Sequence, residues 1–303
     1  MRIWVVRVAV AVLVLALGIA VGAGPLQQDN DRRARELEVQ RQRVAERDLR
    51  VADLQEAGRF TDAYVSATAG NVLRGALAGR AVTVVLLPGG DPRKAAELGS
   101  LIGLAGGAVT GTVVLTSGLV AAEKRQLVEA LTSQMATQSK LAMPTGANGY
   151  QRFGALLARG IGVPPAAKVP RAPYDPVAVS LLAGFGTAEL VGGRSVSARA
   201  ALVLVVSGTS NGEGGDGVLA TVLRSLATQV PAVVTGPRSA ATGSGLLAQL
   251  RGATGAPGMS TVDGVDGPVG KVTAVLALAA RARGVVGAYG GTASATAAIP
   301  PAP

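Results

Sequence analysis

The chain begins with an apolar segment that is long enough to cross a membrane. No charged residue occurs from Val8 to Gln28. A helix of that length spans about 30 Å, which is the thickness of one bilayer core. We therefore predict a transmembrane anchor over residues 1–28. The alternative is a signal peptide cleaved near Val21–Ala23, where small residues fit a cleavage site.

The charges on either side of this segment predict its orientation. Arg2 and Arg7 lie on the N-terminal side, and the first charges after the segment are Asp29 and Asp31. The positive-inside rule then places the N-terminus in the cytoplasm and the rest of the chain outside it. We expect a single-pass protein of the cell membrane whose bulk is extracytoplasmic.

Residues 29–59 form a charge-dense segment with a thin apolar seam. Leu37, Val44 and Val51 repeat every seven residues, and Leu54 follows at the next seam position. This spacing predicts a helix that pairs with other copies in parallel as a weak coiled coil, giving a homodimer or a higher homo-oligomer. The alternative is a solvated single helix held by charge pairs four residues apart.

From Phe60 onward, short apolar runs alternate with helical patterns. The runs that predict buried strands are Ala81–Leu87, Ala108–Leu115, Ala200–Val206, Ala232–Thr235 and Ser260–Val262. The segments that predict helices are Pro92–Leu104, Ser117–Met135, Tyr150–Arg159, Pro176–Leu190, Val218–Thr228, Gly245–Leu250 and Pro268–Arg283. Such alternation indicates a mostly parallel sheet covered on both faces. We predict an extracytoplasmic α/β domain over residues 60–291, either one doubly wound sheet or two α/β halves, and a disordered tail over 292–303.

The sequence contains no His and no Cys, which excludes several kinds of active site. A His-based triad, a His-ligated metal, a thiolate nucleophile and a disulfide are all ruled out. Gly208–Gly212 fits the Gly-x-Ser-x-Gly pattern of a hydrolase elbow, but we expect the helix there only from Val218. Gly264–Lys271 departs from the phosphate-loop pattern at Val265 and Val272. We expect neither an enzyme nor a bound cofactor.

The net charge of +10 forms no evident nucleic-acid-binding patch along the sequence, and only the charge before the anchor is an orientation signal. The net charge divides into +2 before the anchor, zero in the charged helix and +8 spread over the remainder. Aromatic residues are 3% of the chain, too few for the platforms on which nucleic-acid bases stack. We therefore expect no nucleic-acid partner and name the membrane and other envelope proteins instead.

Two acidic residues are the candidate metal ligands. Asp263 and Asp266 lie between a predicted strand and a predicted helix, and carboxylates suit Mg²⁺ or Ca²⁺ better than copper. The alternative for Asp266 is capping of the helix that starts at Pro268. Three scattered methionines, which we expect to fill the core rather than to bind copper, are Met135, Met143 and Met259.

The C-terminal region resembles a known family. The residues that carry the likeness are Ser260, Thr261, Val262, Asp263, Asp266 and Tyr289. With Val109–Val113 and the N-terminal segments, they resemble the mycobacterial copper transporter B family over nearly the whole chain. The resemblance implies an actinobacterial cell-envelope protein in copper efflux or copper homeostasis, sometimes described as an outer-membrane channel. Family members often carry His near the C-terminal end, and its absence beside Tyr289 argues against direct copper coordination.

Two functions of different class follow. The first is the copper role that the resemblance implies, carried out without enzymatic chemistry. A channel would then need several copies or a partner, because one transmembrane helix cannot line a pore. The second function follows from the predicted architecture: a coiled-coil extracytoplasmic scaffold that regulates cell-division or cell-wall hydrolase partners through its charged helix.

Overall fold

The computed structural model describes the backbone of residues 2–252 and 258–301. Within these ranges, the side chains outside the description are those of residues 2–7, 17–35, 194 and 213. The chain divides into two units, Met1–Thr61 and Asp62–Pro303.

One long helix, α1 (Arg2–Leu73), makes up the first unit and supplies the beginning of the second. The helix that we predicted over residues 29–59 therefore continues well beyond its expected end. The reason is packing, because Val65, Ala69 and Leu73 contact an apolar cluster of the second unit.

The predicted anchor falls largely on residues 1–7 and 17–35, whose side chains lie outside the described set. In the part of the chain that the structure does describe, no helix is both long and apolar enough to span a membrane. The seam residues of the charged helix are described, and each has at least half of its surface exposed: Leu37, Val44, Val51 and Leu54. Pairing along this seam stays a prediction.

Among the described residues, seven strands form one sheet in the order β4-β2-β1-β6-β7-β8-β9. Their bounds are β1 (Ala81–Leu86), β2 (Ala108–Leu115), β4 (Val191–Val196), β6 (Leu202–Val206), β7 (Ala232–Gly236), β8 (Met259–Asp263) and β9 (Ala288–Tyr289). Only the edge strand β4 runs antiparallel to its neighbour in this sheet. A small separate sheet pairs β3 (Arg171–Pro173) with β5 (Ala198–Ala200). The mostly parallel sheet is confirmed, and it is one doubly wound sheet rather than two halves.

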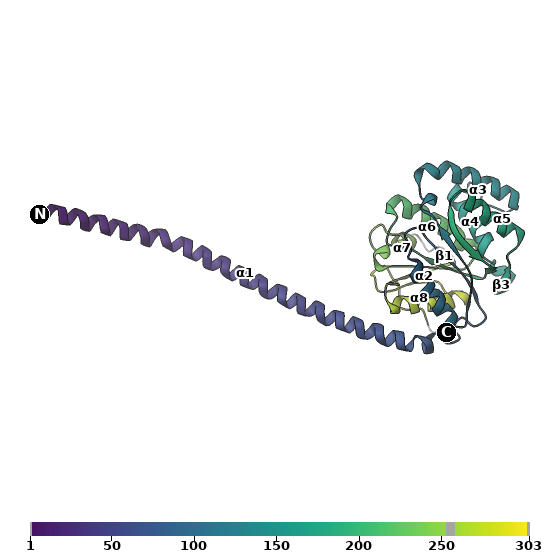
Figure 1. Cartoon of the computed structure of the whole chain (residues 1–303), viewed down its shortest axis with the longest axis horizontal. Helices are drawn as coiled ribbons and strands as arrows, with labels where there is room; N and C mark the ends of the chain where they lie inside the picture. Colours follow the sequence, from purple (N-terminus) through teal and green to yellow (C-terminus); the bar gives the residue numbers. More distant parts are fainter. Residues whose placement is uncertain (1, 253–257, 302–303) are drawn as a thin grey trace. The chain divides into compact units, whose positions relative to one another are not determined.

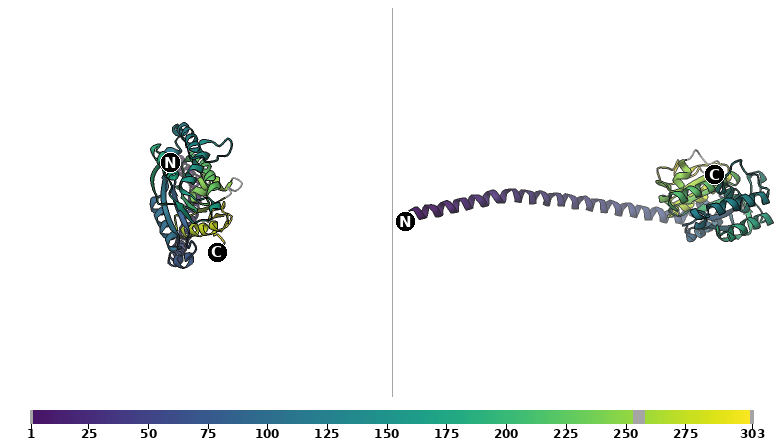
Figure 2. Two further views of the ribbon diagram at one scale, coloured as in Figure 1. Left: turned by 90° about the vertical axis from the view of Figure 1, so that its right-hand side faces the viewer. Right: turned by 90° about the horizontal axis from the view of Figure 1, so that it is seen from above.

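Helices cover both faces of the main sheet (Figures 1 and 2). One face carries α3 (Arg125–Ser139), α4 (Gly149–Ile161), α5 (Pro176–Thr187), α6 (Gly212–Gln229) and α7 (Leu246–Gly252). The other face carries α2 (Pro92–Leu104), α8 (Pro268–Ala282) and the last turns of α1. Short 3₁₀ turns are η1 (Ser117–Leu119), η2 (Ala122–Lys124), η3 (Pro165–Ala167) and η4 (Arg238–Ala241).

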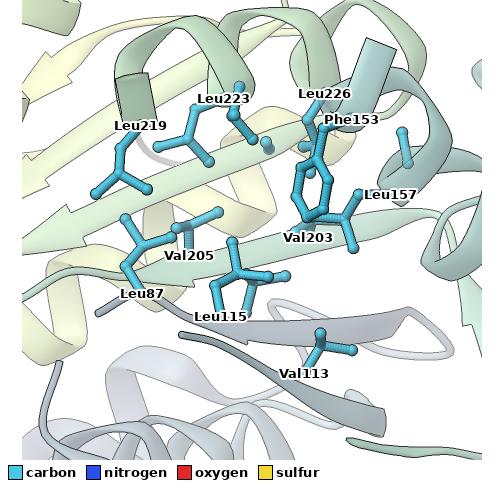
Figure 3. Packing of buried hydrophobic residues seen from close by; sticks show 14 of the residues in the cluster. Leu87, Val113, Leu115, Phe153, Leu157, Val203, Val205, Leu219, Leu223 and Leu226 are labelled. Carbon is cyan, nitrogen blue, oxygen red and sulfur yellow. The ribbon is translucent and has the colours of Figure 1, made fainter. Parts of the chain in front are cut away.

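Because successive side chains of a strand point to opposite faces, the wholly apolar strands contribute side chains to two separate cores, one on each face of the sheet. In β1, Val84 packs under α2 and α8, whereas Val85 packs under α4 and α6. Figure 3 shows this second core, where Phe153 of α4 and Leu223 of α6 lie over the strands. A side chain at Gly154 would collide with the backbone of α6, so this glycine lets the two helices approach closely.

Several predicted elements differ from the structure at their ends; the helix expected over Pro176–Leu190, for example, ends at Thr187 as α5. The helix expected over Ser117–Met135 is two 3₁₀ turns followed by α3, which continues to Ser139. The helix expected from Val218 already begins at Gly212 as α6. The strand expected over Ala200–Val206 is interrupted at Ala201, with β5 before it and β6 after it.

Candidate functional site

The residues that carry the family likeness meet at the carboxyl end of β8. Strand β8 holds Ser260, Thr261, Val262 and Asp263, all of them buried. It pairs in parallel with β9, and Val262 lies beside Tyr289 in the register. Burial raises the pKa of the Tyr289 phenol above its usual value. The sequence pattern thus corresponds to a buried strand pair and the loop that follows it.

Asp263 forms a buried ion pair with Arg251 of α7. Nη1 of Arg251 lies 2.9 Å from Oδ2 of Asp263, with side-chain exposures of 4% and 0% respectively. Arg251 also donates to Oγ1 of Thr261 at 2.9 Å and to the carbonyl oxygen of Tyr289 at 2.8 Å. The guanidinium therefore joins α7 to both strands of the pair.

Asp263 also accepts two further hydrogen bonds. Oγ1 of Thr292 donates to Oδ2 at 2.7 Å, and the backbone N–H of Gly291 donates to Oδ1 at 2.9 Å. Burial alone would raise the pKa of Asp263, but the hydrogen bonds from Thr292, Arg251 and Gly291 and the charge of Arg251 outweigh it. The pKa of Asp263 therefore lies below its usual value, and the side chain is an anion at neutral pH.

The segment after β9 completes this network. We predicted a disordered tail from Thr292, yet Thr292 and Ser294 each accept a hydrogen bond from Nη1 of Arg251, at 3.0 and 2.9 Å. The backbone N–H of Gly290 donates to the carbonyl oxygen of Ala297 at 3.1 Å. The small and proline-rich composition of the segment predicts disorder, but its hydroxyl groups accept hydrogen bonds from a buried guanidinium.

Asp266 takes a different partner from Asp263. Its Oδ1 lies 2.5 Å from Nζ of Lys94 on α2, at a half-exposed position. The expected cap on α8 is wrong, because Gly267 occupies the N-cap position and no side chain caps this helix. The Asp266 carboxylate pairs instead with Lys94, which belongs to the neighbouring helix α2.

The structure does not bring the two candidate metal ligands together on one cation. A guanidinium holds Asp263 and an ammonium holds Asp266, so each carboxylate is already neutralised. Among the side chains that the structure describes, no three acidic residues gather closely enough to hold a metal ion. A fixed positive charge at Arg251 also opposes a cation beside Asp263.

A cavity of about 370 Å³ adjoins the ion pair. Its wall is mostly backbone and small side chains, and its main residues are Asp62, Arg238, Asp263, Gly264, Gly270 and Ile299. Arg238 donates from Nη2 to the carbonyl oxygen of Gly291 at 2.9 Å, so its charge lies on the rim of the same loop. The cavity therefore lies beside the loops that follow β8 and β9.

The two glycine-rich motifs also have structural partners. In the first motif, Oγ of Ser210 donates to Oδ2 of buried Asp216 at 3.0 Å, which ties the loop to the first turns of α6. In the second motif, the ammonium of Lys271 pairs with Glu97 of α2. A side chain at Gly270 would collide with the backbone of Gly264, so this glycine serves close packing.

The methionines fit the predicted role as core residues. Met135 and Met259 are buried in the core under α4 and α6, and Met143 packs against its edge. Arg251 is, with Thr292 and Ser294, a residue of the network that the sequence did not reveal. Arg251 lies in the last turn of α7 and belongs to no recognisable sequence motif. Only the fold places it beside Asp263.

Comparison with known families covers almost the whole chain. A family model described as "Copper transport outer membrane protein, MctB" matches residues 1–300. A search among curated proteins gives no match. The matched range contains the charged helix, the strand pair β8–β9 and the segment after it. The resemblance predicted from the C-terminal residues is confirmed.

Proposed function

We propose, because the chain belongs to the MctB family of copper transport outer membrane proteins, that it acts in copper efflux or copper homeostasis in the cell envelope. The observation that carries this proposal is the family match over residues 1–300. We further propose that the N-terminal apolar segment is a single-pass anchor, with the N-terminus in the cytoplasm and the α/β domain outside it. The uncharged run from Val8 to Gln28 supports this topology.

The role is one of assembly rather than of copper coordination or catalysis. The chain has no His or Cys, and Met135 and Met259 are buried in the core. Met143, the one described methionine that is only partly buried, is a lone thioether, so the described residues gather no set of the ligands that copper prefers. The acidic side chains at the candidate site are neutralised by Arg251 and Lys94. A copper pathway would then be formed between several copies or with a partner protein.

We propose that the charged helix supplies this assembly by pairing with a second copy or more. Its seam residues are exposed in the single chain, as expected of a surface that another helix covers. Anchoring in one membrane would raise the local concentration of the copies and favour weak pairing.

A deletion strain tests the copper role. We expect growth of the strain to be more sensitive to copper than growth of its parent, and the full chain to restore tolerance. Cell separation should remain normal. Normal copper tolerance together with chained cells would overturn the copper role and favour the scaffold function for division or cell-wall hydrolase partners. A topology reporter fused after Arg59 should be active only outside the cytoplasm.

A further inference from the structure

We infer that the charged helix pairs with a second copy of this chain as a parallel, in-register, two-stranded coiled coil whose orientation is set by two charge pairs. This inference rests on the pairing proposed above and specifies its geometry. With Leu37, Val44 and Val51 at the a positions of a heptad, Leu54 takes a d position. Val44 and Val51 at a with Leu54 at d fit the pattern that favours two strands over three or four, while the other two d positions hold the polar residues Gln40 and Arg47 and keep the pairing weak.

The charged residues beside the seam fit a parallel partner. In a parallel coiled coil, each g residue faces the e residue five positions further along the other helix. Glu36 at g then faces Arg41 of the other copy, and Arg43 at g faces Asp48. Both pairs have opposite charges, and two-fold symmetry produces each of them twice.

The antiparallel arrangement is less favourable. It would bring g residues beside g residues and e residues beside e residues of the other copy, so matching Leu37 with Leu54 places Arg43 next to Arg50 and Arg41 next to Asp48. The repulsive and attractive pairs then offset each other, whereas both kinds of charge pair in the parallel arrangement attract. Arg47 takes a d position in either arrangement, and its long side chain can carry the guanidinium out of the seam into water.

The length of the interface follows from the other end of the same helix. Gly58 takes the a position after Val51 and offers no side chain to a partner. Val65, one heptad later, packs against the protein's own α/β core instead. The a positions before Gly58 are Leu37, Val44 and Val51, which are 50–54% exposed in the single chain. A second copy therefore covers residues 36–57, and the α/β domain covers the seam beyond them.

Single cysteines test this geometry in the full chain in native membranes, because the natural sequence contains no Cys. In a parallel, in-register pair, each a residue faces its own counterpart. We expect the Val44→Cys chain to form a disulfide-linked dimer at least tenfold faster than the Gln42→Cys chain, whose cysteine lies at an f position away from the seam. Leu49→Cys, also at an f position, is a second control.

The charge pairs are tested in the Val51→Cys background. Arg43→Glu places a carboxylate opposite Asp48 and should lower the crosslinking rate about tenfold, since two attractive pairs become repulsive. Adding Asp48→Arg restores opposite charges and should restore the rate. An unchanged rate in Arg43→Glu, or no recovery in the double variant, would contradict the assigned pairs.

Failure of the inference can be told apart from failure of the proposed function. Crosslinking of Val44→Cys chiefly to a co-expressed Arg47→Cys chain would show an antiparallel pair and overturn the inference alone. Equal crosslinking of Gln42→Cys and Val44→Cys would also overturn it. A monomeric full chain by sedimentation in detergent would overturn the pairing altogether. The copper sensitivity of the deletion strain reports separately on the copper role.

Discussion

Nη1 of Arg251 donates to Oδ2 of Asp263 at 2.9 Å, and neither side chain has more than 4% of its surface exposed. This contact joins the end of α7 to the end of β8, and the hydroxyls of Thr292 and Ser294 join the C-terminal segment to it. A buried ion pair stabilises only when its remaining donors and acceptors are satisfied. Here the strands and the C-terminal segment supply those partners, so the residues of the family likeness hold one another in place.

Removing the cation of this pair should strongly destabilise the fold. In Arg251→Met the Asp263 carboxylate stays buried without its counter-charge, and we expect the free energy of unfolding to fall by about 3–5 kcal/mol. The matched control is Lys94→Met, which breaks the half-exposed pair with Asp266 and should cost less than about 1 kcal/mol. Urea unfolding of both variants measures the difference. Equal losses would show that burial of the Arg251 pair is unimportant.

The lowered pKa of Asp263 predicts a pH dependence of stability. A carboxyl group whose pKa is lower in the folded state adds stability that is fully present above its unfolded pKa of about 3.9. That stability is lost as pH falls through the lower folded pKa. Asp263→Asn should therefore be less stable than the natural chain at pH 7, and the gap between the two should close below about pH 4.

Urea unfolding of both chains from pH 7 to pH 3 measures this gap. Asp175 also has a lowered pKa: burial alone would raise it, but the hydrogen bonds from Ala178 and Arg159 and the charges of Arg159 and Arg199 together outweigh burial. Because both chains contain Asp175, its contribution cancels in the difference. A gap that stays constant to pH 3 would refute the role assigned to the Asp263 charge.

A third prediction concerns the glycine beside this ion pair. Gly290 has φ +134°, and a Cβ there would collide with the Asp263 carboxylate. We expect Gly290→Ala to lower the free energy of unfolding by more than about 3 kcal/mol, since it adds a steric clash to backbone strain. Gly284 is the control, because it also has positive φ but has open space around it. Gly284→Ala should cost only about 1–2 kcal/mol, and similar losses for both would contradict the clash.

The predictions from sequence succeeded where local pattern and tertiary packing agree. Helix α2 and strand β2 have the predicted bounds, because Asp91 caps the one and an apolar run forms the other. Strand β4 was missed because its sequence holds two glycines and an arginine, and only pairing with β2 makes it a strand. The start of α6 was missed because its first turn is rich in glycine and depends on the contact between Ser210 and Asp216.

The candidate site shows the same division. Asp263 and Tyr289 could be selected from the sequence because family-related residues cluster around them. Their partner Arg251 could not, since an arginine at the end of a helix is ordinarily a surface residue. Likewise, the small and proline-rich composition of the segment from Thr292 predicted disorder, and the contacts that hold Thr292 could not be foreseen because its partners are distant in sequence. Contacts between separate segments decide these positions, and spacing along the chain does not reveal them.

The last prediction concerns the boundary between the two units. The apolar clusters of the α/β unit include Val65, Ala69 and Leu73 of α1 but no residue before them. A chain of residues 62–303 should therefore fold with the Tm of the full chain and stay monomeric, because it lacks the seam. A chain that starts at Arg74 loses Ala69 and Leu73 from the core and should be less stable than the 62–303 chain by about 2–5 kcal/mol. Circular dichroism melting and sedimentation measure both properties. A dimer of residues 62–303 would place the contact between copies in the α/β unit and not in the charged helix.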